Sequence, residues 1–564
     1  MKKRNARFFG LAAAVVLATM LPHFALAQPA GQQTLEKKID AVMTEVYKPG
    51  QPGAAIILRK NGQILFRKAY GLADLELNVP MEPDMIFRLG SITKQFTAVS
   101  ILMLAEQGKL SLQDEITKFL PDYPVQGRKI TVEHLLTHTS GIQSMTDMPE
   151  WLSMWRKDFT LTELIDLFKD KPMQFEPGEH WAYCNSGYIL LGAIIEKVSG
   201  QTYEEFVDSH IFKPLGMKHS CYGDTDRIIP RRIPGYQTGK DGFINAPYLS
   251  MTQPYAAGAL LSSVDDLAVW SEAVFSGKLV KREWLDKAFI PYRLKAGEST
   301  GYGYGWFIAD FDGHRSIEHG GGINGFITYE ITIPEDGIFL AILTNSAVEG
   351  REPEPRAVKI ARLALGLAEP ERKTVSLAGQ DLGPLIGIYE DFRKSQLLIT
   401  RSGDKLMFQR QGGAQVELLA SSATEFFFKD NPAHVKFVKD VNGQVAGVGI
   451  QSRIGPAQIF DKTDKPLPTP RKEAVVDPKV FDRYLGEYEL APGFTISIVK
   501  RGERLFSLAT GQPEVEIFPE SETRFFLKVV DAQVEFVLDA SGRATGLILH
   551  QGGQDLPAKK IKTP

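Results

Sequence analysis

Ser-x-x-Lys occurs three times in the chain, beginning at Ser91, Ser402 and Ser497, and this motif can supply a nucleophile together with its base. It carries that chemistry on a helix, where residues three apart share a face and the lysine amine reaches the serine hydroxyl. Only the pair Ser91 and Lys94 lies at the start of a strong helical pattern. Free N–H groups at a helix N-terminus would also stabilise a developing oxyanion. Taken alone, the pair is better explained as a helix N-cap with a solvated lysine.

A tyrosine that could assist such a serine is Tyr183, which begins the only Tyr-x-Asn in the sequence and is followed by Asn185. With an ordinary pKa near 10, tyrosine is a poor base, but a nearby ammonium group lowers that pKa. A Ser–Lys–Tyr cluster could therefore deprotonate the serine without a histidine. By itself, the motif fits a structural tyrosine at a turn.

The third element is the run Glu-His-Gly-Gly-Gly-Ile-Asn-Gly-Phe at residues 318–326. Three glycines beside a strand would permit close backbone approach and leave amides free for an acyl oxygen. The run also matches a dinucleotide-binding fingerprint, but a strand pattern follows it where that fingerprint requires a helix. It resembles the oxyanion loop of α/β-hydrolases too, although in that fold the loop precedes the nucleophile.

The elements around these motifs mix helical and strand periods. Alternating runs at 54–59 and 63–69 are joined by Lys-Asn-Gly and predict a hairpin. Further strands are predicted at 304–311, 326–333 and 338–344, and helices at 93–107, 132–137, 161–168, 187–198, 263–275 and 354–365. Strands at both ends with helices between them indicate an α+β domain whose terminal strands pair into one antiparallel sheet.

Beyond Glu369 the composition shifts to short alternating strands, and an internal repeat appears. Residues 386–390 match residues 485–489, and several further identities share the same offset of 99 residues. Each copy has room for about eight short strands and is predicted to form a small antiparallel, lipocalin-like β-barrel. A proline-containing linker at 461–472 separates the copies. Neither copy contains a catalytic constellation.

The N-terminus has the features of a secretory signal peptide. A basic start is followed by a short apolar run and by Ala25-Leu26-Ala27, so cleavage is predicted near Ala27. The apolar run is too short to span a membrane, and no later segment is long and apolar enough, so we expect no transmembrane anchor. The sequence thus predicts an exported protein, periplasmic or secreted, with domains at 28–368, 369–465 and 466–564, the last including the linker.

Length and charge narrow the function classes further. A chain of 564 residues requires several domains. It holds 65 basic and 68 acidic residues, and loss of the leader with its four basic residues gives a formal charge of −7. That balance provides no global field for nucleic acid or anionic membranes. Two cysteines cannot build a disulfide framework or a four-thiolate zinc site.

Taken in order, Ser91-x-x-Lys94, Tyr183-x-Asn185 and His319-x-Gly321 resemble the serine β-lactamase-related family. This family comprises class C β-lactamases, DD-peptidases and their esterase and D-aminopeptidase relatives. The resemblance covers about residues 35–365. It is strengthened by the segments that flank the motifs, at residues 87–91, 135–141, 254–270 and 302–306. It implies a β-lactamase/transpeptidase-like fold, in which helices and a helical subdomain flank an antiparallel sheet. It implies no metal or organic cofactor.

Carried over by position, the resemblance makes Ser91 the acylated nucleophile and Lys94 the group that assists its deprotonation. Tyr183 would be the general base or a proton relay, so the proton is assigned to the pair of Lys94 and Tyr183. Asn185 would orient Lys94 and the substrate amide. The backbone N–H groups of Ser91 and Gly322 would bind the oxyanion.

Two positions depart from the pattern of true β-lactamases. His319 stands where they usually carry lysine, and histidine is mostly neutral near pH 7. This disfavours penicillins and free C-terminal carboxylates and favours esters, amides or peptides with a D-amino end, since D-aminopeptidase relatives also carry histidine there. Cys184 replaces the usual serine, and both a disulfide with Cys221 and a buried free thiol remain open.

The sequence therefore predicts an exported serine hydrolase that cleaves amide, peptide or ester bonds, including those of D-amino acids, through a Ser91 acyl-enzyme. One alternative is a true β-lactamase or DD-carboxypeptidase, and another is a slowly deacylating penicillin-binding receptor. The expected substrate is a small molecule or peptide, and the oligomeric state stays open. The barrels resemble those of D-aminopeptidase relatives, in which one barrel narrows the cleft, although two packed stabilising modules are an equal alternative.

Overall fold

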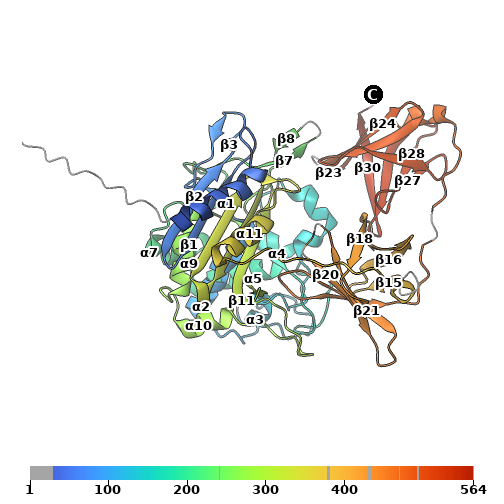
Figure 1. Cartoon of the computed structure of the whole chain (residues 1–564). Helices are drawn as coiled ribbons and strands as arrows, with labels where there is room; N and C mark the ends of the chain where they lie inside the picture. The colour runs from blue at the N-terminus through green and yellow to red at the C-terminus, as the bar shows by residue number, and fades with distance from the viewer. Residues whose placement is uncertain are drawn as a thin grey trace, which may run out of the picture.

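The computed structural model describes residues 30–562 apart from 240–241, 378–381, 430, 432, 469–470 and 492–493. The predicted signal peptide therefore lies outside the described residues. The chain forms one large α+β unit followed by two β-barrels, which lie on the same side of that unit (Figure 1). The sequence predicted this α+β unit and the two antiparallel eight-stranded barrels.

The large unit is built on a six-stranded antiparallel sheet in the order β10-β11-β12-β13-β1-β2. Its strands are β1 (Ala54–Lys60), β2 (Gln63–Tyr70), β10 (Phe307–Phe311), β11 (His314–Ile323), β12 (Phe326–Ile333) and β13 (Ile338–Thr344). β1 pairs with β13 from Ala54 opposite Thr344 to Lys60 opposite Ile338. The predicted joining of the two ends of the domain in one sheet is thus confirmed.

Both faces of this sheet are covered, which explains why every residue of β13 is buried. On one face lie α1 and α11, which pack Ile39, Met43 and Ile360 against the sheet (Figure 1). On the other face lies a larger core that includes α2 and α5. The helices are α1 (Ala30–Val46), α2 (Thr93–Glu106), α3 (Val132–Leu136), α4 (Leu161–Asp166), α5 (Asn185–Ser199), α6 (Tyr203–Val207), α7 (Lys213–Leu215), α8 (Tyr255–Gly258), α9 (Val264–Phe275), α10 (Arg282–Ala288) and α11 (Pro353–Leu365).

Short strands complete the large unit and lie mainly around its loops. They are β3 (Leu72–Asp74), β4 (Val79–Pro80), β5 (Phe87–Arg88), β6 (Cys221–Tyr222), β7 (Tyr236–Gly239), β8 (Gly242–Asn245), β9 (Leu260–Ser262) and β14 (Ser346–Ala347). A sheet in the order β5-β9-β6 holds the chain that enters α2.

Each sequence repeat closes into its own barrel. Barrel 1 consists of β15 (Gly387–Glu390), β16 (Gln396–Ser402), β17 (Lys405–Arg410), β18 (Gln415–Ala420), β19 (Glu425–Phe428), β20 (His434–Lys439), β21 (Val445–Gln451) and β22 (Gln458–Lys462). Barrel 2 consists of β23 (Gly486–Ala491), β24 (Phe494–Arg501), β25 (Arg504–Ala509), β26 (Val515–Pro519), β27 (Arg524–Leu527), β28 (Ala532–Leu538), β29 (Ala544–Gln551) and β30 (Gln554–Lys562).

The repeated tyrosine of each barrel makes the same contact. Tyr389 is buried and its hydroxyl donates to Leu385 O at 2.7 Å, and Tyr488 is buried and donates to Tyr484 O at 2.6 Å. A buried tyrosine hydroxyl requires such an acceptor, so this contact explains why the repeat keeps tyrosine at this position.

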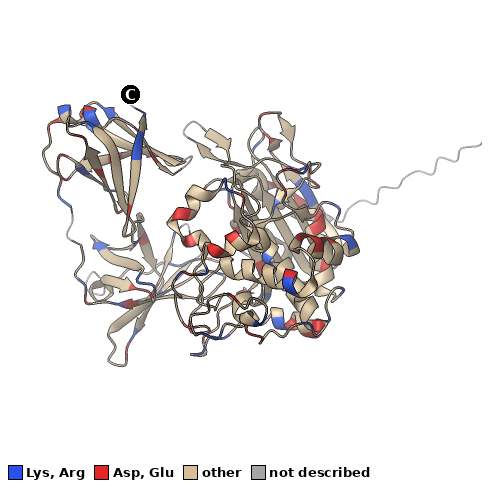
Figure 2. Cartoon of the chain, turned by 180° about the vertical axis from the view of Figure 1, so that it is seen from behind, with Lys and Arg blue, Asp and Glu red and all other residues tan. Residues whose placement is uncertain are grey.

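Acidic and basic residues are distributed over all three parts of the chain in the view of Figure 2. Among the described residues, no helix combines the length and apolar composition needed to cross a bilayer.

Candidate active site

Ser91 lies in a 3-10 turn, Gly90–Ile92, that runs directly into α2. Gly90 has a left-handed φ of +57°, and a Cβ there would lie 2.9 Å from Gly322 N. Glycine is therefore required by both backbone conformation and space. The turn leaves Ser91 half-buried beside β11.

Lys94 is fully buried one turn further along the same helix. Its Nζ donates to Ser91 Oγ at 3.1 Å, to Asn185 Oδ1 at 2.8 Å and to Ala257 O at 2.8 Å. Burial lowers the pKa of Lys94 to about 7, because a desolvated ammonium is disfavoured relative to the neutral amine. A substantial fraction of Lys94 is thus unprotonated near neutral pH and can accept the Ser91 proton.

Asn185 is held at the first position of α5, where the Cys184 thiol caps the helix by accepting from Gly187 N at 3.3 Å. The Asn185 side chain donates through Nδ2 to Thr146 Oγ1 at 2.9 Å, which directs Oδ1 toward Lys94. Cys184 and Cys221 are both free thiols. Sequence reasoning missed Thr146, because a single threonine in an irregular segment carries no periodic signal.

Tyr183 lies beside this pair, with Lys94 Nζ 4.8 Å from the centroid of its ring. Its hydroxyl is buried and interacts with the Ser91 side chain, although this contact does not have full hydrogen-bond geometry. Burial raises the pKa of Tyr183, whereas the sequence argument expected an ammonium group to lower it. The reason for the difference is that burial of the Tyr183 hydroxyl itself disfavours the charged phenolate. The structure therefore favours Lys94 as the base of the pair.

The glycines of the third motif lie inside strand β11. The sequence had predicted them beside a strand, so this prediction was wrong. A Cβ on Gly321 would lie 1.9 Å from Leu89 O, the carbonyl that also accepts from Thr328 Oγ1 at 2.7 Å. Gly322 is exposed, and a Cβ there would meet nothing within 4 Å. Gly321 thus lets β11 approach the chain that carries Ser91, and Gly322 borders the space beside it.

These neighbouring glycines predict a sharp difference in stability. Gly321→Ala is expected to lower the free energy of unfolding by about 1–3 kcal/mol, because its methyl group overlaps a backbone carbonyl that cannot rotate away. Gly322→Ala is the matched control and should unfold within about 0.5 kcal/mol of the wild type. Urea unfolding of both variants measures the difference. Equal stabilities would contradict the close approach of β11 to Leu89.

The His319 ring is buried and does not line the cavity above Ser91. Its Nδ1 lies 2.5 Å from Gly320 O, which can only accept, so Nδ1 carries the proton, and the Tyr302 hydroxyl lies 3.1 Å from Nε2. Burial and the nearby charge of Lys94 lower the pKa of His319 to about 3. His319 is therefore a neutral part of an aromatic cluster that includes Tyr183, whose ring centroid lies 6.2 Å away.

Ser91, Asn185 and Gly322 line one cavity of about 450 Å³. Tryptophans 151 and 155 and other apolar side chains form most of its wall. None of the described residues that line it carries a charge. The remaining lining residues are Gly90, Met145, Thr146, Ile189, Gln237, Leu249, Gln253, Pro254, Ala257, Gly258, Ile323, Asn324, Gly325, Phe326, Ile327 and Ala347.

A groove of about 690 Å³ adjoins this cavity and shares Trp155, Gln237 and Ala347 with it. Its opposite wall belongs to barrel 2 and includes Phe494 and Thr510. The groove therefore extends from the Ser91 cavity to the second barrel. Sequence reasoning could not find it, because even the nearest residues of its two walls, Glu349 and Ala491, are 142 positions apart along the chain.

Other motif copies lie apart from this cavity. Ser402 pairs with Lys405 across the hairpin of β16 and β17, and Ser497 lies in barrel strand β24. Gly-x-Ser-x-Gly, the nucleophile motif of α/β-hydrolases, occurs at residues 297–301. This segment belongs to a loop before β10 and its serine is exposed, so it forms no strand-to-helix nucleophile elbow. Ser91 alone combines the helix, the buried lysine and the cavity.

A half-buried serine and a fully buried lysine at a helix N-terminus, set against a strand of an antiparallel sheet, define the class of β-lactamase and penicillin-binding folds. The family model for Beta-lactamase matches residues 35–365, and the chain belongs to this family. Residues 470–560, in the region of barrel 2, match a domain of unknown function, DUF3471.

Related proteins support this assignment. Penicillin-binding protein 4* of Bacillus subtilis (strain 168) is 25% identical over 549 residues, covering 94% of this chain and all of that protein. Protein flp of Staphylococcus aureus (strain MW2) is 28% identical over 318 residues, covering 55% of this chain and 63% of that protein.

Two solved structures are similar as well. The octameric penicillin-binding protein homologue from Pyrococcus abyssi has a TM-score of 0.54 at 29% identity and covers 76% of this chain and 99% of its own. The D-amino acid amidase from Ochrobactrum anthropi SV3 has a TM-score of 0.53 at 26% identity and covers 59% of this chain and 99% of its own.

Proposed function

We propose that this protein is an exported serine hydrolase that cleaves uncharged amide or ester bonds, including amides of D-amino acids, through a Ser91 acyl-enzyme. One observation carries the proposal. A fully buried lysine, with its pKa lowered to about 7, lies 3.1 Å from the hydroxyl of a serine that opens into a cavity. Such a pair generates a nucleophile without a histidine.

In the proposed reaction, Ser91 Oγ attacks the substrate carbonyl carbon while its proton passes to Lys94 Nζ. The N–H groups of Ser91 and Gly322 stabilise the oxyanion that forms. The Tyr183 hydroxyl, which interacts with the Ser91 side chain, relays the proton from Lys94 to the leaving group, which departs as a neutral amine or alcohol. Water then attacks the acyl-enzyme by the reverse route and releases the acid and free Ser91.

The chemistry of the cavity supports a substrate that is neutral and apolar near the scissile bond. No charged side chain among the described residues lines the cavity, so a substrate carboxylate would find no opposite charge there, and the α-amino group of a D-amino-acid amide would enter as the free amine. The aromatic wall formed by Trp151 and Trp155 suits an apolar side chain. The likeness to a D-amino acid amidase supports D-amino-acid amides among the candidates.

The groove between the catalytic unit and barrel 2 supports a role for that barrel in limiting substrate size. Because the groove continues the cavity, a long substrate would contact Phe494 and Thr510 as well as Trp155. Two stabilising modules remain the alternative for the barrels, and the hydrogen bond from Gln551 Nε2 to Gly412 O at 2.7 Å between them fits that alternative.

Initial rates of the chain 28–564 on four substrates test the proposal, with Ser91→Ala as the blank. We expect p-nitrophenyl butyrate to be hydrolysed, and D-alanine p-nitroanilide to be hydrolysed faster than its L-isomer. Nitrocefin should react slowly, because its carboxylate meets no cation in the cavity. Fast loss of nitrocefin would favour a β-lactamase. No turnover, together with an acyl group on Ser91 found by mass spectrometry, would favour the slowly deacylating receptor.

A further inference from the structure

Glu318 is a buried carboxylate in the strand that forms one side of the active site. It precedes His319 in β11, and its side chain has no exposure to solvent. Its carboxylate accepts from Ser316 Oγ at 2.7 Å and from the Tyr329 hydroxyl. Two neutral donors do not compensate a buried negative charge, so Glu318 requires a cation. The reaction proposed above does not use it.

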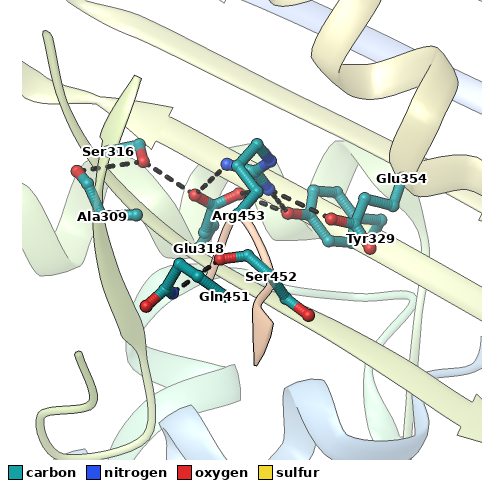
Figure 3. Close-up of polar contacts among 8 residues, drawn as sticks. All are labelled: Ala309, Ser316, Glu318, Tyr329, Glu354, Gln451, Ser452 and Arg453. Atoms are coloured by element: carbon teal, nitrogen blue, oxygen red, sulfur yellow. Dashed lines mark hydrogen bonds and ion pairs between the residues drawn. The ribbon is translucent and has the colours of Figure 1, made fainter. Parts of the chain in front are cut away.

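The cation comes from barrel 1 and not from the catalytic unit. Arg453, in the turn between β21 and β22, donates through Nη1 to Glu318 Oε1 at 2.7 Å and through Nη2 to Oε2 at 2.6 Å. Figure 3 shows its guanidinium group between Glu318 and the pair of Tyr329 and Glu354. The Arg453 side chain is only 14% exposed. Among the described residues, no other cation lies within ion-pair distance of Glu318.

The same turn also contacts the neighbouring strand β10. A Cβ on Gly301 would lie 3.2 Å from Gly455 C, and a Cβ on Gly455 would lie 3.3 Å from Phe307 Cε1. The Phe307 ring in turn lies 5.2 Å from the His319 ring, measured between centroids. The turn 452–457 therefore reaches the active-site cluster by two routes, an ion pair to β11 and a van der Waals contact through β10.

We propose that Arg453 is a positioning residue through which barrel 1 holds strand β11, and with it His319 and Gly322, in the geometry that Ser91 requires. Successive residues of a strand point to opposite faces, so an ion pair at Glu318 acts on the face behind His319. Loss of Arg453 leaves a buried charge without a partner, and β11 must shift or admit water to solvate it.

Such a shift affects Ser91 directly. β11 contacts the Ser91 turn so closely that a Cβ on Gly321 would lie 1.9 Å from Leu89 O. A displacement of about 1 Å at the reacting groups costs up to about 100-fold in rate. Catalytic competence of the Ser91 site thus depends on a residue of the appended barrel. The inference rests on the proposed role of Ser91.

The test compares full-length wild type, Arg453→Met, Arg453→Lys, Glu318→Gln and the double variant Arg453→Met/Glu318→Gln. Two quantities are measured, the rate at which a fluorophosphonate labels Ser91, followed by intact mass, and the kcat and KM for p-nitrophenyl butyrate. We expect Arg453→Met to slow labelling and lower kcat by about 10- to 100-fold with KM within about threefold. The double variant should recover most of the loss, because it no longer buries a carboxylate, and Arg453→Lys should fall between.

A purely structural role of Arg453 predicts a different pattern. It would lower the melting temperature but leave labelling and kcat unchanged in the folded protein, and that result overturns the proposal. The proposal is also overturned if labelling and kcat of the double variant are no faster than those of Arg453→Met. If Arg453→Met does not fold, Arg453→Lys decides by the same two measurements. Lys436→Met is the control, because it removes an exposed cation of the same barrel that pairs with Glu425. If the fluorophosphonate labels the wild type but no substrate is turned over, the proposed hydrolase is refuted. The labelling rates of the variants would still test the role of Arg453.

Discussion

Ser91→Ala is expected to lower kcat/KM by about 10³- to 10⁶-fold on every substrate that the wild type hydrolyses, with the fold intact. The reason is that the acyl-enzyme cannot form without Oγ, whereas the cavity and its N–H groups stay in place. Lys94 also keeps its two other acceptors, Asn185 Oδ1 and Ala257 O, each at 2.8 Å, so its orientation should persist. Initial rates and far-UV circular dichroism measure activity and fold.

The control for this variant is Ser402→Ala. Ser402 is the first residue of another Ser-x-x-Lys, but it is exposed and lies in a barrel hairpin, so its loss should leave kcat/KM within twofold of the wild type. A Ser91→Ala protein that retained more than a tenth of the activity would show that another group is the nucleophile. After incubation with a fluorophosphonate, intact mass should find one label per chain, and mass spectrometry of the digested peptides should place it on Ser91 and on neither Ser402 nor Ser497.

The second large effect concerns Lys94 and pH. Because Lys94 must be unprotonated to accept the Ser91 proton and its pKa is lowered to about 7, kcat/KM should rise with pH up to about 7 and then level off. Below that value it should fall tenfold per pH unit. The histidine of the third motif does not produce this limb, because the pKa of His319 is lowered to about 3. A pH–rate profile on an uncharged ester measures the limb.

Two variants of Lys94 distinguish its role as a proton acceptor from the effect of its positive charge. Lys94→Arg keeps a cation that does not lose its proton in the accessible pH range, and Lys94→Met removes the charge. Both should lower kcat/KM by about 10²- to 10⁴-fold. Lys109→Met, at an exposed lysine just beyond α2, is the control and should keep both the rate and the pH profile. An active Lys94→Arg enzyme would contradict a neutral lysine base and return that role to Tyr183.

Much of the fold could be predicted because its signals are local. The hairpin at 54–69, the helix that begins at Thr93 and the strands at 326–333 and 338–344 occur as their periodicities indicated. The barrels were predicted from an internal repeat, and the tyrosine that occurs in both copies, Tyr389 and Tyr488, makes the same hydrogen bond in each. These patterns report burial on one face of an element, which each segment encodes in its own residues.

The predictions that differed from the structure concerned glycine and charge. Glycine has a low strand propensity, so the glycines after His319 were expected beside a strand, yet they lie inside β11. There the close approach to Leu89 outweighs propensity. The pKa of Tyr183 was expected to fall beside an ammonium group, but burial raises it and lowers that of Lys94. Desolvation depends on the complete packing around a group, which no local pattern records.

The sequence by itself determined the residue types of the site, their order and the number of domains, because each is written in contiguous motifs and repeats. Only the tertiary structure decided which of the three Ser-x-x-Lys copies has a buried amine. It further decided that no charged side chain among the described residues lines the cavity. It also decided that Arg453, 135 residues after Glu318, provides the partner of that carboxylate. These features depend on desolvation and on contacts between segments far apart in the chain, so they exist only once the chain has folded.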